Sequence, residues 1–159
     1  MKPQKQPLLL SVLLTSTMPL LAQVEKVAIR TSGISCGVCA GLSELHFKRL
    51  PGVDNVRISL SQEAIMLTYK PGATFDPEGI RKFLGSLEVG VVQFQISAQG
   101  CVQEQDGKRF FIAGKDRFIL VPAGDGPIPG DTPVLIEAIL NDRLDPMELR
   151  ILKFKPLKE

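Results

Sequence analysis

The chain has 159 residues, of which 44% are hydrophobic and 23% charged, a composition that argues against wholesale disorder and suits one medium domain or two small ones. Lys2 and Lys5 account for the net charge of +2, so the remaining 17 Lys and Arg equal the 17 Asp and Glu. This neutrality, with no Trp and a single Tyr, argues against nucleic acid as a partner.

The first 22 residues have the pattern of a secretory signal peptide. Lys2 and Lys5 form a basic end, residues 8–21 an apolar middle, and Ala22 ends a plausible cleavage site. The apolar part is short for a membrane span and is interrupted by polar residues and Pro19; an uncleaved membrane anchor is the alternative. We therefore expect a periplasmic or secreted protein with no stable membrane insertion after cleavage.

Alternation of apolar and polar residues predicts four strands in the next part of the chain, over residues 24–31, 53–60, 64–69 and 89–97.

Two helices are expected between these strands. The first covers residues 38–50 and is stopped by Pro51-Gly52. The second begins after Asp76, which can cap free N–H groups, with Pro77 at its first position. Its apolar face is formed by residues at helical spacing: Ile80, Phe83, Leu84 and Leu87. The resulting order, βαββαβ, is the ferredoxin-like arrangement.

Five short strands are predicted in the last third of the chain, over residues 100–105, 109–113, 117–122, 134–140 and 147–154. Asp106-Gly107 indicates a hairpin, and the Gly- and Pro-rich residues 123–133 indicate a loop. Strand count and spacing resemble an OB-type β-barrel. The predicted class is α+β, with a ferredoxin-like domain at 23–98 and a small all-β barrel at 99–159.

Cys36 and Cys39 form a CxxC pair at the expected start of the first helix. Free N–H groups and the helix dipole favour negative charge there, so thiols ionise more easily. Two thiolates suit a soft ion, Cu(I) or Hg(II); Zn(II) and Cd(II) are less favoured, since zinc normally takes four ligands. Redox pairs share this spacing, and a disulfide closes readily in an oxidising compartment.

Residues 24–97 resemble the heavy-metal-associated domain of copper chaperones, metal-pumping ATPases and periplasmic mercury-scavenging proteins. The resemblance is carried by Gly33-Ile34-Ser35-Cys36-Gly37-Val38-Cys39 and, at the family's spacing, by Leu50-Pro51-Gly52-Val53. It implies that Cys36 and Cys39 are the metal ligands and that the partner is a metal-transporting membrane protein or another metal-accepting protein. Ile34 replaces the family's Met, and Val stands near Gly90 where the family often has an aromatic residue or Lys, so the metal preference stays open.

Three further positions bear on the site. His46 lies about 10 Å along the helix from Cys39, at about 1.5 Å per residue, too far to share an ion. Cys101 is either a small buried residue or a third thiol. Leu42 and Leu45 should point outward, either packing on the barrel or forming a docking patch.

Motifs for hydrolase, phosphate-binding or zinc-protease chemistry are absent from the sequence, so we expect no enzyme. The alternatives to metal transfer are an exported adaptor with a vestigial or disulfide-bonded CxxC, and a thiol–disulfide redox protein.

Overall fold

Eight strands and two helices make up the part of the chain that the computed structural model describes, residues 22–121 and 126–157. Residues 1–21 of the predicted signal peptide, and residues 122–125 at the end of a predicted strand and in the predicted loop, lie outside this part. In chain order the elements are β1 (Gln23–Ser32), α1 (Gly37–Arg49), β2 (Val53–Ser59), β3 (Ala64–Tyr69), α2 (Pro77–Ser86), β4 (Gly90–Gln105), β5 (Lys108–Ala113), β6 (Asp116–Val121), β7 (Val134–Asn141) and β8 (Glu148–Pro156). Neither helix is long and apolar enough to cross a membrane.

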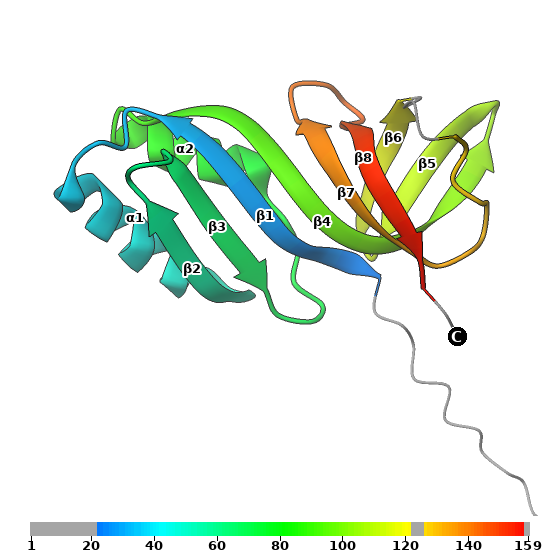
Figure 1. Ribbon diagram of the computed structural model, residues 1–159, viewed down its shortest axis with the longest axis horizontal. Helices are drawn as coiled ribbons and strands as arrows, with labels where there is room; N and C mark the ends of the chain where they lie inside the picture. The colour runs from blue at the N-terminus through cyan, green and yellow to red at the C-terminus, as the bar shows by residue number, and fades with distance from the viewer. Residues whose placement is uncertain (1–21, 122–125, 158–159) are drawn as a thin grey trace, which may run out of the picture.

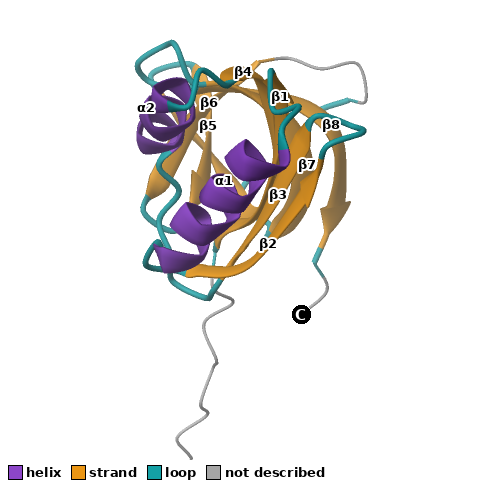
Figure 2. Ribbon diagram, turned by 90° about the vertical axis from the view of Figure 1, so that its left-hand side faces the viewer, coloured by secondary structure: helices purple, strands orange, loops and turns teal. Residues whose placement is uncertain are grey.

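The first four strands form an antiparallel sheet in the order β2-β3-β1-β4. Both helices pack on one face of this sheet, as Figures 1 and 2 show. The order of elements is the predicted βαββαβ, and the structure as a whole is α+β.

The core of this part lies between the sheet and the two helices. Phe47 of α1 and Leu84 of α2 are fully buried, together with Ile29, Ile65 and Phe94 from the strands. Helix α2 begins as predicted: Asp76 is its N-cap, and the Asp76 Oδ1 accepts a hydrogen bond from the Gly79 N–H at 2.9 Å. Burial of one apolar face fixes the helix on the sheet.

Strand β4 belongs to both halves of the molecule. Its first part pairs with β1, from Ser32 opposite Gly90 to Gln23 opposite Gln99. Its later part pairs with β5 and, on residues 94–100, with β7. The two strands predicted over 89–97 and 100–105 are therefore one continuous strand, and the predicted domain boundary after residue 98 falls inside it (Figure 1).

Gly100 sits in the middle of this shared strand because no side chain fits there. It is buried, and a Cβ at this position would overlap the carbonyl oxygen of Ile112 on β5. Glycine at this position thus allows two strands to approach closely.

The second half is a closed five-stranded barrel. The strands follow one another as β4-β5-β6-β8-β7, and β7 pairs back onto β4. All neighbours are antiparallel except β6 and β8. The interior is apolar, with Phe111, Phe118 and Ile136 fully buried.

Candidate metal site

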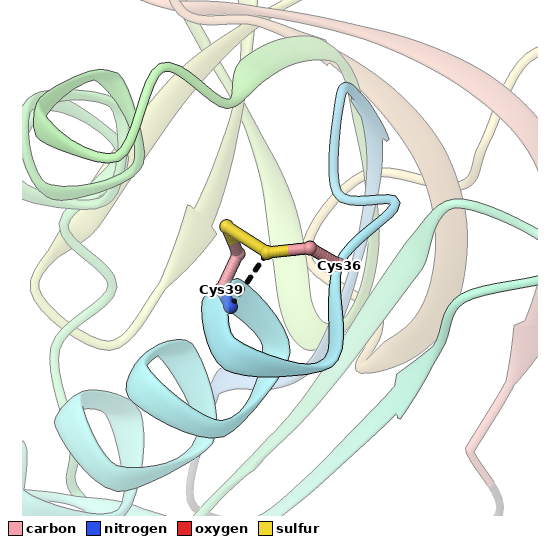
Figure 3. The surroundings of a disulfide bond; sticks show 2 residues. All are labelled: Cys36 and Cys39. Atoms are coloured by element: carbon pink, nitrogen blue, oxygen red, sulfur yellow. Dashed lines mark hydrogen bonds between the residues drawn. A yellow bond between two sulfur atoms is a disulfide. The ribbon is translucent and has the colours of Figure 1, made fainter.

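The two cysteines sit at the N-terminus of α1, as the sequence predicts. Cys36 is the N-cap residue, and its Sγ accepts a hydrogen bond from the backbone N–H of Cys39 at 3.1 Å (Figure 3). The first turn contains no acidic residue that would oppose a negative charge on sulfur. A thiolate at this position is therefore favoured by both the hydrogen bond and the helix dipole.

The structure joins Cys36 and Cys39 in a disulfide, with their Cα atoms 5.4 Å apart. The backbone thus places both sulfurs within reach of one soft ion once the pair is reduced. Cys36 is exposed and Cys39 is half-buried, so an incoming ligand can reach the pair.

Residues 33–39, here called the dithiol loop, are anchored to the turn between β2 and β3. The Glu63 backbone oxygen accepts hydrogen bonds from both the N–H and the Oγ1 of Thr31, each at 2.8 Å. One side-chain oxygen of Glu63 accepts from the Gly33 N–H at 3.1 Å. Gly33 has a φ of +89°, which favours glycine, and the side chain of Ile34, the next residue of the loop, is fully buried.

Glu63 is a site residue that the sequence analysis did not find. A Ser-Gln-Glu turn between two strands carries no signal for a contact that is made 30 residues away in the chain.

An apolar stripe on α1 lies next to the dithiol. Val38, Leu42 and Leu45 are 72%, 48% and 51% exposed. The prediction that Leu42 and Leu45 point outward is confirmed, and neither is buried against the barrel.

His46 and Cys101 do not join the dithiol. His46 is half-buried and stacks on Phe83, with ring centroids 3.5 Å apart, and burial lowers its pKa. Cys101 is a free, half-buried residue of β4 and pairs with Ile112 of β5. The end of β4 near the dithiol loop is Gly90, which pairs with Ser32. Cys101 lies eleven residues beyond Gly90, about 36 Å along the strand at about 3.3 Å per residue. Among the described residues, no three His, Cys, Asp or Glu side chains gather into a metal-binding group.

Comparison with known proteins shows a similarity in sequence to part of a copper-exporting ATPase. Over 54 residues the chain is 32% identical to a copper-exporting P-type ATPase of Bacillus subtilis; this stretch is 34% of the chain and 7% of the ATPase. The chain thus spans a small fraction of that relative's length. No protein-family profile matches the chain.

Among solved structures, a yeast copper transporter domain determined in apo and Cu(I)-loaded states aligns with 43% of this chain and 94% of its own. The sequence identity is 20% and the TM-score 0.36.

Proposed function

We propose that this chain is an exported copper-binding protein that captures Cu(I) through Cys36 and Cys39 and passes it to a partner's cysteines. The observation that carries the proposal is the cysteine pair at the N-terminus of α1, in which Cys36 is exposed and Cys39 half-buried. The similarity of 54 residues to part of a copper-exporting ATPase supports copper as the metal.

Capture begins with the reduced pair. A dithiol reductant supplies two electrons and two protons to the disulfide and leaves two thiols. Both thiols release their protons when Cu(I) binds, and the ion is then held by two sulfurs.

Transfer to the partner is a ligand exchange and not a redox step. A partner thiol loses its proton and attaches to Cu(I), one Cu–S bond to this chain breaks, and the released cysteine sulfur takes up a proton. A second exchange releases the ion, which stays Cu(I) throughout. Two ligands and an exposed site keep this path open, whereas a closed four-ligand site would block it.

The same reasoning ranks the metals. Two thiolates suit Cu(I) and Hg(II), while Zn(II) and Cd(II) would need ligands from elsewhere. Because Val occupies the positions near Gly90, no lysine there offsets the negative charge of a bis-thiolate complex. Hg(II), whose bis-thiolate complex is neutral, is therefore kept as the runner-up cargo, and copper stands first because of the similarity to the copper-exporting ATPase.

The remaining parts of the proposal concern context. The partner is a metal-transporting membrane protein or another metal-accepting protein, the compartment is periplasmic or extracellular, and the chain has no enzymatic activity. We also propose an OB-type barrel, supported by its five strands and by the parallel β6–β8 pair among antiparallel neighbours.

Competition with a chromophoric Cu(I) chelator under anaerobic, reducing conditions tests the proposal. We expect the wild-type chain to remove Cu(I) from the chelator, and Cys36→Ser and Cys39→Ser each to bind at least about 100-fold more weakly, because one thiolate cannot replace two. A parallel Hg(II) titration ranks the two metals. Equal Cu(I) affinity in the wild type and the Cys36→Ser, Cys39→Ser double variant would sink the proposal.

One observation favours a second function. Because Cys36 and Cys39 form a disulfide, the pair is also suited to thiol–disulfide exchange, or to a permanently oxidised adaptor. Turnover of a model disulfide substrate by the reduced chain would favour exchange, and no reduction of the pair by excess dithiol would favour the adaptor.

A further inference from the structure

The barrel contacts the first half of the molecule through a partly buried ion pair. Arg81 on α2 and Asp142, which directly follows β7, form a bidentate contact: Nε donates to Oδ2 at 2.5 Å and Nη2 donates to Oδ1 at 2.8 Å. The Asp142 side chain is 6% exposed and that of Arg81 27%. This geometry is the strong, directional form of an Arg–carboxylate pair.

Arg81 extends this contact to the start of β4. Its third donor, Nη1, donates to the carbonyl oxygen of Val91 at 2.9 Å, and its guanidinium lies 5.1 Å from the centroid of the Phe94 ring. Asp142 orients the guanidinium, and the guanidinium holds Val91. The opposite charge and hydrogen bonds of Arg81 outweigh burial and lower the pKa of Asp142.

Val91 lies directly beside the strand that leads into the dithiol loop. It pairs with Thr31 of β1, and the neighbouring Gly90 pairs with Ser32, at a point where the register of the two strands shifts. A Cβ on Gly33 would lie 3.4 Å from the Glu88 carbonyl oxygen, so the segment before β4 borders the loop itself. Because the register shift disrupts the regular pairing of β1 and β4 here, contacts from outside the two strands contribute more to holding this end of them together.

We propose that Asp142 is a positioning residue of the dithiol loop, acting from the barrel through Arg81 and the Val91 carbonyl. The inference rests on the proposed function in one respect, that the loop's order matters for metal capture. It gives the barrel a role in a chain whose dithiol is at the start of α1, and that end of α1 lies on the side of the first half away from the barrel (Figure 1). A fixed loop keeps the two sulfurs close, and a loosened loop lowers the effective concentration of one sulfur at the other.

The primary test needs no metal. In glutathione redox buffers we expect Asp142→Asn to make the Cys36–Cys39 disulfide about threefold or more easier to reduce, because effective concentration sets the exchange equilibrium. In native-state hydrogen exchange, the amides of Thr31 and Gly33 should exchange about tenfold faster, while barrel-core amides such as that of Phe118 keep their rates.

Two further variants separate positioning from general damage. Arg81→Lys keeps the positive charge but loses the planar fork that reaches Asp142 and Val91 together, so it should reproduce both changes. Asp145→Asn, an exposed change in the same β7–β8 loop, is the matched control and should leave both values at wild type.

Cu(I) affinity separates this inference from the proposed function. Asp142→Asn should bind Cu(I) several-fold more weakly than Asp145→Asn, through the same loss of effective concentration. If the redox and exchange shifts appear in a chain that binds no Cu(I), positioning stands and the proposed function fails. If Asp142→Asn and Arg81→Lys match Asp145→Asn in the redox equilibrium, positioning is overturned whatever the copper result.

Discussion

Helices α1 and α2 pack on the same face of one sheet, yet they use their apolar residues differently. Helix α2 buries Pro77, Ile80 and Leu84, and none of its large apolar side chains is among the exposed ones. Helix α1 buries only Ser43 and Phe47 and exposes an apolar stripe beside the cysteines. The first helix therefore leaves part of its apolar surface accessible around its reactive end, whereas the second buries most of its apolar face in the core.

The largest expected difference between the helices is in the cost of truncating a leucine. Leu84→Ala on α2 should lower the free energy of unfolding by about 3 kcal/mol, because a fully buried side chain is lost and a cavity remains. Leu42→Ala on α1, where the side chain is half exposed, should change it by less than about 0.5 kcal/mol. Urea denaturation followed by circular dichroism measures both. Similar losses in the two variants would contradict this division of roles.

The N-cap residues of the two helices should differ by an intermediate amount in their contribution to stability. Asp76→Ala removes the hydrogen bond to the Gly79 N–H and should cost about 1 kcal/mol. Under reducing conditions Cys36→Ser should cost nothing measurable, because serine is itself a preferred N-cap residue. Thermal unfolding with excess reductant compares the two variants. A loss from Cys36→Ser as large as that from Asp76→Ala would mean that the cysteine is retained for stability.

The smallest effect concerns the stacked pair of His46 on α1 and Phe83 on α2. Burial lowers the pKa of His46 in the folded chain, so the unfolded chain binds more protons as the pH falls through the ordinary value near 6.5. Stability should therefore decline slightly between pH 7 and pH 5, and His46→Gln should flatten that part of the profile. The free energy of unfolding measured at half-unit steps checks this. Parallel profiles for the two chains would show that His46 contributes no pH dependence.

Local patterns predicted most of the fold. Alternating residues located β1, β2 and β3 to within two residues, and Asp76-Pro77 located the start of α2, because these signals depend on near neighbours in the chain. The CxxC motif likewise predicted where the two sulfurs meet.

Contacts between distant residues could not be predicted in this way. The sequence predicted two strands where β4 is continuous, since the close approach of Gly100 to Ile112 becomes visible only when β4 and β5 are paired. Arg81 and Asp142 lie 61 residues apart, and nothing in either surrounding sequence marks them as partners. The support that Glu63 gives to the dithiol loop could not be predicted either, because Glu63 and Gly33 lie 30 residues apart. The sequence thus indicated the reactive groups but not the residues that hold them in place.

The central claim is that the reduced cysteine pair is the copper site of this chain. The most direct test compares Cu(I) binding by one wild-type preparation before and after reduction of the Cys36–Cys39 disulfide. Anaerobic competition with a chelator measures the binding in both states. We expect the reduced chain to bind one Cu(I) tightly and the oxidised chain to bind none, because a disulfide sulfur is no longer a thiolate ligand. Equal Cu(I) binding in the two states would contradict it.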